Sequence, residues 1–538
     1  MRILPLKHSP RETPGSPLLF WTLILALALR ILTLLRNDPV TFDSAAYFEM
    51  AEFLRAGRWS DSLLNAYPPL FPILIAALQR VGLSAENAGL LLALASNLVV
   101  LLMIVAITRR VAGERAACGA AFLWAIHPYA VRLGTRALSD APTAFFVASS
   151  LCLGLWASER KRLTWAIGAG AASGLAYLTR PEGIEPALAL AGFFLVQSST
   201  RLHRRILWAL APIVGWAIIA SPYVAYLSIE SGSFTLSKKK SPAAMVHSLI
   251  ASDAVTGSSD RATTAPNVPA QTLPQAEMRQ SLSAEAPPVD ARAQARESRL
   301  RKMARSVYLF QRPLVNGVHP VVLFFAAFAP WSLRPKKNEG DPRVKALLAS
   351  LVILHFVVLV GVASIMGPDY LGGHHFFLMT LYLLPFAAAG LAAITDWLRK
   401  RLPALPWLTA AVLAAAILAT LPSTVFRAPE RGGIMREGGM WIRQHASGRP
   451  VVATDVAKLT YHAGAERIPF SGNPGHAVRV ARAQGAEWLA IYGDDTDGLF
   501  DSVQKILKES DLDLAAEFSE TSGQRVYRLR IYRLRKTS

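Results

Sequence analysis

Two aspartates in this sequence stand at the borders of long apolar runs, where a carboxylate is chemically useful. Asp43 lies in TFDSAAYFEM, just after the apolar run at 17–35, and Asp140 lies in ALSDAPT at the start of another run. A carboxylate close to a membrane surface is placed to act as a general base toward a substrate hydroxyl, and two carboxylates together suit a hard cation. The structural alternative for each aspartate is a helix N-cap.

Arginines near the same kind of border suit phosphate. Arg136 lies between two apolar runs, and Arg180 follows another run in LTRPEG. The planar guanidinium group binds phosphate oxygens through several N–H groups at once. One alternative is an arginine that merely extends to the membrane interface. For Arg180 the other alternative is an ion pair with Glu182 or Glu185.

Two adjacent histidines are further candidates. His374 and His375, in GGHHFF, precede a late apolar run and suit diphosphate or sugar hydroxyl groups. Because neighbouring side chains diverge on a helix, we expect at most one of the two to face a given site. The sequence has no HExxH or CxxC spacing, so it predicts no certain metal site or cofactor and leaves a divalent cation as an open alternative.

Membrane helices must position these residues. The chain is 52% hydrophobic and only 17% charged, and apolar runs of roughly 17 to 25 residues are long enough to cross a bilayer. We predict about eleven spans from this pattern. They lie at 17–35, 86–107, 117–131, 141–158, 163–179, 184–199, 206–228, 318–333, 344–366, 374–395 and 403–422.

The basic residues orient these spans and account for the net charge of +20 without a nucleic-acid partner. Lys and Arg gather in short loops that the positive-inside rule assigns to the cytoplasm. All these basic loops can lie in the cytoplasm only if residues 68–82 do not cross the membrane. We therefore predict juxtamembrane helices in a first external loop at 41–83. The N-terminus is then cytoplasmic, and the candidate site residues share the outer face.

Two further segments lie outside. The long loop at 229–317 has a middle part, 251–290, whose composition predicts mobility. The basic stretch at 291–310 reads either as an amphipathic helix on anionic membrane lipid or as a solvated charged helix. After the membrane region, 1–425, the segment 426–538 alternates the strand-like runs VVAT, RIPF, EWLAIYG and RVYRLRIYRL with helices, which predicts a small α/β domain. We expect helices at 475–485 and 498–509, and one in DVAKLTYHAG with Asp455 as its N-cap.

Several of these stretches together resemble the GT-C superfamily of integral membrane glycosyltransferases. The resemblance is to bacterial relatives of the protein O-mannosyltransferases and of the aminoarabinose–lipid A transferase, and it covers roughly residues 18 to 400. The matching stretches are FDSAAYFEMAEFLRAGRW, YPPLFPILIAAL, ALSDAPTAFF, GLAYLTRPEGI and GGHHFFLMTLYLLPFAAAGL. Tyr67 is a departure, because relatives often carry Glu or His just before the proline of that motif.

The resemblance implies a polyprenyl-phosphate sugar as donor, a lipid, glycan or protein acceptor, and an active site on the periplasmic face of a bacterial inner membrane. It implies that Asp43 is the base, that Asp140 is a second acidic catalytic position and that Arg180 neutralises the donor phosphate. The substrate-binding candidates are Tyr47, Tyr67, Arg136, Arg180, Glu182, His374 and His375.

The sequence therefore predicts a glycosyltransferase that works by a single inverting displacement. Three alternatives stay open. The long external loop also fits an oligosaccharide ligase or polymerase that uses a diphosphate-linked donor. A lipid or solute transporter is less favoured, because few charges lie inside the spans and no inverted repeat is visible. The third alternative is a non-catalytic assembly subunit.

Overall fold

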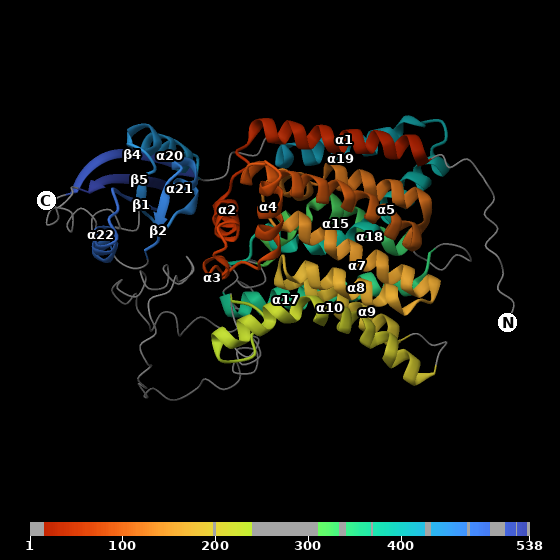
Figure 1. Ribbon diagram of the computed structural model, residues 1–538. Coiled ribbons are helices and arrows are strands. Elements are labelled where there is room, and N and C mark those ends of the chain that lie inside the picture. The colour runs from red at the N-terminus through yellow and green to blue at the C-terminus, as the bar shows by residue number, and fades with distance from the viewer. Residues whose placement is uncertain are drawn as a thin grey trace, which may run out of the picture.

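The computed structural model describes residues 15–196, 201–238, 310–332, 340–366, 370–425, 432–470, 474–494, 512–522 and 525–534. A bundle of helices lies beside a smaller domain built on a five-stranded sheet (Figure 1). The predicted fold class, a helical membrane region followed by a small α/β domain, is confirmed. The predicted mobile stretch 251–290, the basic stretch 291–310 (described only at residue 310) and the predicted helix 498–509 lie outside the described residues.

Seven helices in the described part of the chain are long and apolar enough to cross a membrane. They belong to α1 (Gly15–Arg36), α5 (Ala85–Ile126), α7 (Asp140–Arg160), α10 (Leu202–Ser231), α17 (Pro342–Met366), α18 (Phe377–Arg401) and α19 (Trp407–Thr424). The chain is therefore a multi-pass membrane protein. Helix α5 kinks at Gly113, whose φ is 78°, so its two arms correspond to two of the predicted spans.

Three other predicted spans correspond to shorter helices. These are α8 (Leu163–Tyr177), α9 (Glu185–Leu195) and the pair α15 (Pro320–Ala327) with α16 (Ala329–Ser332). Helices of such lengths do not reach across a core of about 30 Å by themselves. The total of about eleven spans therefore stays a prediction.

Small residues allow the helices of the bundle to approach closely. Helix α8 packs on α7 and α10. A Cβ added at Gly170 would overlap the backbone of Pro212, and one at Gly215 would overlap the carbonyl of Ile167. Close backbone contact through small residues is a main source of helix association in membranes.

A buried arginine joins α1 to α5. Arg30 is 0% exposed, and its Nε and Nη2 donate to Oδ1 of Asn97 at 2.9 and 2.6 Å. Its Nη1 donates to the carbonyls of Ala26 and Ala125. Hydrogen bonds therefore satisfy this cation inside an apolar bundle, where an unsatisfied charge is costly.

The segment predicted to be a first external loop forms three short helices, in agreement with the predicted juxtamembrane helices. They are α2 (Phe42–Arg55), α3 (Trp59–Leu63) and α4 (Leu70–Arg80). The 11 residues of α4 rise only about 16 Å, which is too short to cross the bilayer core. These helices lie at the end of the bundle that faces the C-terminal domain (Figure 1).

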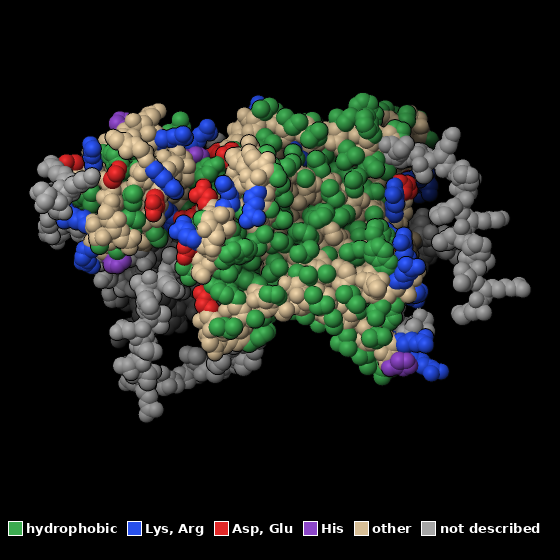
Figure 2. Space-filling model, in the orientation of Figure 1, with side chains coloured by type: hydrophobic (Ala, Val, Ile, Leu, Met, Phe, Trp, Pro, Cys, Tyr) green, Lys and Arg blue, Asp and Glu red, His purple; other side chains and the backbone are tan. Residues whose placement is uncertain are grey.

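The surface of the bundle is divided in the way that a membrane protein requires. Apolar side chains cover the length of the helices, and Lys and Arg gather at the end opposite the C-terminal domain (Figure 2). Exposed Arg109, Arg115, Lys161 and Arg162 belong to the loops that the positive-inside rule assigns to the cytoplasm.

The C-terminal sheet has the strand order β2-β1-β3-β5-β4. The strands β1 (Val451–Ala453), β2 (Glu466–Ile468) and β3 (Trp488–Asp494) are parallel, while β4 (Leu512–Ser522) and β5 (Arg525–Leu534) are antiparallel. The sequence predicted each strand except β4, whose mixed polar residues give a weak strand pattern.

Helices α20 (Gly433–His445), α21 (Ala457–Ala463) and α22 (Pro474–Ala483) complete the domain, and α22 confirms the helix expected at 475–485. The prediction that Asp455 caps α21 is wrong. The N-cap position falls at Val456, and the hydroxyl of Thr454 accepts the Val456 N–H at 3.2 Å.

Candidate active site

Asp43 does not cap the helix that carries it. The N-cap of α2 is Thr41, whose Oγ1 accepts from the Ser44 N–H, while Ser44 Oγ accepts from the Thr41 N–H. This capping box satisfies the first turn. Asp43 is exposed and accepts a 2.7 Å hydrogen bond from the Tyr67 hydroxyl at Oδ1. The described residues provide no donor to Oδ2.

Tyr67, which bonds Asp43, packs against a second tyrosine, Tyr47. The rings of Tyr47 and Tyr67 lie 4.8 Å apart, and the hydroxyls of Tyr47 and Ser139 share a 2.9 Å hydrogen bond. Burial, reinforced by the charge of Asp43, raises the pKa of both tyrosines well above their usual range. Both phenols therefore stay protonated, and Tyr67 remains a donor to Asp43.

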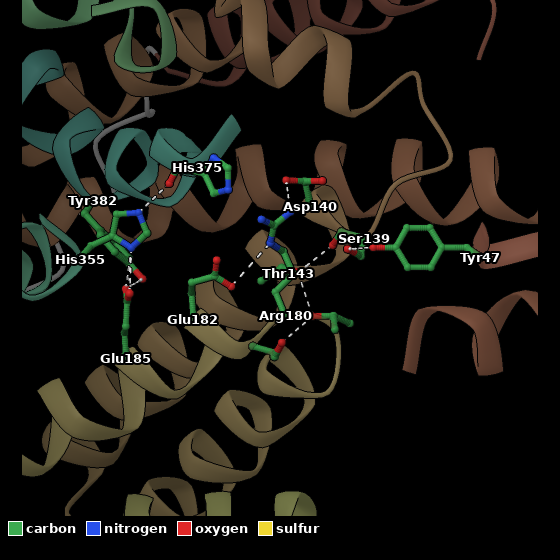
Figure 3. A network of polar contacts seen from close by, with 12 residues as sticks. Tyr47, Ser139, Asp140, Thr143, Arg180, Glu182, Glu185, His355, His375 and Tyr382 are labelled. Carbon is green, nitrogen blue, oxygen red and sulfur yellow. Dashed lines mark hydrogen bonds and ion pairs between the residues drawn. The ribbon is translucent and has the colours of Figure 1, made fainter. Parts of the chain in front are cut away.

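Asp140 forms an ion pair with Arg180 (Figure 3). The Arg180 Nη1 donates to Asp140 Oδ1 at 2.7 Å, and its Nε lies 3.7 Å from Glu182 Oε2. Ser139 rather than Asp140 is the N-cap residue of α7. The Asp140 side chain, only 7% exposed, is therefore directed to the arginine and does not cap the helix.

The charges of this cluster support one another. Burial alone would lower the pKa of Arg180, but the carboxylates of Asp140 and Glu182 raise it above its ordinary value. Burial alone would raise the pKa of Glu182, and Arg180 lowers it below its ordinary range. Asp43 also contributes to the electrostatic environment of Arg180. Arg180 and Glu182 are therefore both charged at this site.

The turn that presents Arg180 is held from three sides. Gly183, in the short 3-10 helix η1 (Pro181–Ile184), packs against the backbone of Ala176 and leaves no room for a Cβ. The Ser173 hydroxyl donates to the Gly183 carbonyl at 2.6 Å. The hydroxyls of Thr143 and Thr179 lie 2.8 Å apart and tie the residue before Arg180 to α7.

The loop at 41–83 is joined to the same turn. The Leu70 N–H donates to the Leu178 carbonyl at 2.9 Å, two residues before Arg180. This bond follows directly after the Tyr-Pro-Pro segment that carries Tyr67. The predicted candidates from the loop at 41–83 and from the turn that carries Arg180 are thus brought together.

A small open hollow lies beside the ion pair. Its walls include Arg180, Glu182, His374 and His375. The expectation that only one histidine faces the site is wrong, because the imidazole rings lie 4.0 Å apart and both line the hollow. Gly372 N–H donates to Nδ1 of His375, which folds that ring back beside its neighbour within the 3-10 helix η4 (Gly373–Phe376).

A second buried cluster adjoins the hollow and was missed from the sequence. Glu185 accepts from His355 Nδ1 at 2.8 Å and from the Tyr382 hydroxyl at 3.3 Å, so it does not pair with Arg180. His355 Nε2 lies 2.8 Å from the His375 carbonyl. A lone histidine in the apolar run VILHFVV was the available signal, since ionisable groups inside spans are seldom incidental.

Comparisons with known proteins agree with this architecture. Residues 66–226 match a family model described as dolichyl-phosphate-mannose-protein mannosyltransferase. No curated protein sequence matches the chain. The structure of ArnT from Cupriavidus metallidurans bound to undecaprenyl phosphate is 15% identical, covers 96% of this chain and 98% of that chain, and superposes with a TM-score of 0.53. A second similar structure is the archaeal oligosaccharyltransferase AglB from Archaeoglobus fulgidus in complex with an inhibitory peptide and a dolichol-phosphate. It is 14% identical, the match covers 88% of this chain and 69% of that chain, and the TM-score is 0.53.

The chain has the GT-C glycosyltransferase fold. In this GT-C chain the half-buried Arg136 does not line the hollow, so its predicted substrate contact stays a prediction. Among the described residues no group of three His, Cys, Asp or Glu side chains is arranged to hold a metal ion. Asp140, one of the two carboxylates considered as cation ligands, is already engaged by Arg180.

Proposed function

We propose that this chain is a membrane glycosyltransferase that moves a sugar from a polyprenyl-phosphate donor to an acceptor hydroxyl. The observation that carries the proposal is an exposed aspartate, Asp43, whose charge acts on Arg180, the half-buried arginine that lines the hollow of a GT-C bundle. The likeness to ArnT bound to undecaprenyl phosphate and to AglB bound to a dolichol-phosphate supports this donor class.

The reaction is a single displacement at the anomeric carbon. The acceptor oxygen forms a bond to that carbon while the bond from the carbon to the phosphate oxygen breaks, and the polyprenyl phosphate leaves with the electron pair. Oδ2 of Asp43 takes the proton of the acceptor hydroxyl. One displacement inverts the configuration of the sugar.

Arg180 has the role of stabilising the negative charge that grows on the leaving phosphate. Asp140 fixes the guanidinium through its 2.7 Å bond, so we assign Asp140 to positioning Arg180 rather than to proton transfer. Tyr67 occupies the place where relatives often carry Glu or His, and it holds Asp43 by a neutral hydroxyl. We assign no step to a divalent cation.

The site faces the periplasm of a bacterial inner membrane in this proposal. The basic residues at the opposite end of the bundle support that orientation. The acceptor in this proposal is a hydroxyl group of a lipid, a glycan or a protein. An acceptor would reach Asp43 from the side of the external loop, because Asp43 is exposed there.

The test is transfer by purified protein in liposomes that contain a panel of polyprenyl-phosphate and polyprenyl-diphosphate sugars. Asp43→Asn keeps the shape of the side chain but removes the base, and we expect release of polyprenyl phosphate to fall roughly 100-fold or more. Asp61→Asn is the matched control, because Asp61 is an exposed aspartate in α3 of the same loop, 42% exposed and paired with Arg58.

Equal release by wild type and Asp43→Asn would remove Asp43 from the mechanism. Release of polyprenyl diphosphate instead of the monophosphate would favour the ligase or polymerase alternative. Movement of intact donor across the bilayer with no release of either phosphate would favour the transporter.

A further inference from the structure

The C-terminal domain contacts the membrane region at the helix that carries Asp43. Arg467 Nε and Nη2 donate to the two carboxylate oxygens of Glu49 at 2.9 and 2.7 Å. Lys458 Nζ lies 2.9 Å from Asp38 Oδ2. Asp38 precedes α2 and Glu49 lies within it, so the two ion pairs hold the chain on both sides of Asp43.

An aromatic side chain joins the same two parts. Phe42, the residue next to Asp43, packs against a hydrophobic cluster of the C-terminal domain that includes Ile434, Val456 and Leu529. Its ring centroid lies 6.2 Å from that of Tyr492. The first residue of α2 is therefore packed against the core of the other domain.

The second turn of α2 and the start of α5 contact the domain through one tyrosine. The rings of Phe48 and Tyr461 lie 5.0 Å apart, and the Tyr461 hydroxyl donates to Glu86 at 3.0 Å. Lys458 and Tyr461 both belong to α21, and this helix packs directly against α2.

The two ion pairs between the domains are largely shielded from solvent, which makes their geometry specific. The Lys458 side chain is 5% exposed and that of Asp38 26%. Burial raises the pKa of Asp38, but Lys458 together with a backbone hydrogen bond lowers it below its ordinary value. Arg467 and Glu49 are 18% and 22% exposed, and their two parallel bonds fix orientation as well as distance.

The contacted edge of the sheet is one that open α/β folds commonly use to bind ligands. Strand β1 lies between β2 and β3 in the sheet. The chain passes from β1 to β2 on one side and then to β3 on the other side, so the carboxyl ends of β1 and β3 form a topological switch point. Tyr492 near the end of β3 meets Phe42 there. In this chain α2 lies against that edge.

We propose that the C-terminal domain is the positioning element for the base Asp43. Phe42, Asp38 and Glu49 are the positioning residues, and Lys458 and Arg467 are their partners. The other side of α2 packs on α4 and α5, so the helix is held between the two parts of the molecule. Without the domain, the first turn of α2 would expose Phe42 and open more easily, as segments with few buried contacts do.

This inference rests on the proposed function for its effect on turnover, but its structural part is testable without any donor. Hydrogen exchange of the α2 amides is measured in the full-length protein for wild type, Phe42→Ala, Glu49→Gln, Arg467→Gln and the double variant of the last two. We expect faster exchange in α2 for each single variant, with the double variant no faster than the more affected single one, because the residues act as a pair.

The same variants are then assayed for polyprenyl phosphate release. We expect kcat to fall roughly 10- to 100-fold with the donor KM little changed, because a small displacement of a catalytic group has effects of that size. Phe42→Ala is expected to behave alike, and Phe42→Leu to retain most of the turnover. Arg530→Gln is the matched control, because Arg530 is 15% exposed and binds Glu517 at 2.8 Å in the same sheet.

Unchanged α2 exchange in both Arg467→Gln and Phe42→Ala would overturn the proposal. A higher acceptor KM with an unaltered kcat would also overturn it, in favour of a domain that binds the acceptor. If wild type releases no polyprenyl phosphate from any donor, the proposed function fails, while the exchange data still decide whether the domain holds α2.

Discussion

Arg180 has contacts that a different cation would not reproduce. Its guanidinium group bonds Asp140 through Nη1 and faces Glu182 through Nε. Two carboxylates around one arginine leave the cluster with excess negative charge, so the remaining N–H groups must be directed accurately for a phosphate to bind. The fixed fork of arginine supplies that accuracy, whereas a lysine ammonium is a point charge on a flexible stem.

We therefore expect Arg180→Lys to lower kcat for polyprenyl phosphate release about 100-fold, because one ammonium cannot keep both carboxylates and a phosphate. Steady-state assays in liposomes measure this effect. Arg55→Lys, at an exposed end of α2, is the matched control. Wild-type turnover in Arg180→Lys would show that the guanidinium geometry is not used.

At the scale of elements, the turn between α8 and α9 determines where Arg180 and Glu182 lie. The turn is tight because Gly183 packs directly on the backbone of Ala176 and Tyr177, and Ser173 bonds both the Gly183 carbonyl and the Ala187 N–H. A side chain at position 183 would push η1 away from α8. The charged cluster would move with it.

We expect Gly183→Ala to lower stability by roughly 1–3 kcal/mol, as overpacking does, and to lower transfer more than Arg55→Lys does. Thermal unfolding in detergent and the liposome assay measure the two effects. Gly192→Ala is the control, because a Cβ at that position in α9 meets no atom within 4 Å. Equal melting temperatures for the two alanine variants would contradict the role of this turn.

At the scale of the whole molecule, the orientation in the membrane decides which compartment supplies the acceptor. Basic side chains predominate at one end of the bundle, whereas acidic and basic side chains mix at the other end, where α2, α3 and the C-terminal domain lie (Figures 1 and 2). The positive-inside rule places the first end in the cytoplasm. We therefore propose that the candidate site is on the outer side.

Cysteine labelling tests this orientation. Ser60→Cys in the external loop and Arg162→Cys at the opposite end are both exposed positions. Both native cysteines, Cys118 and Cys152, are buried and give little background. We expect a membrane-impermeant maleimide to label Ser60→Cys in intact spheroplasts and Arg162→Cys only after lysis. The reverse pattern would place the site in the cytoplasm.

The helical membrane region, the short external helices and most of the C-terminal strands were predictable from the sequence. Length of apolar runs, spacing of basic loops and alternation in strands are local properties, so they can be read without knowing the packing. β4 was missed because its residues, LDLAAEFSETS, carry little of that pattern. The Asp455 cap was wrong because the helix begins one residue later than expected, with Val456 in the N-cap position.

The sequence by itself determined that Asp43, Asp140 and Arg180 share one face of a membrane protein, since charge distribution and span parity require it. Only the tertiary structure decided which side chains bond to one another. Arg180 pairs with Asp140, 40 positions away. Glu185 is hydrogen-bonded to His355, 170 positions away. Phe42 packs against a domain that follows the whole membrane region in the chain. Such partners depend on how the helices pack against one another, and nothing in the local spacing of residues specifies that packing.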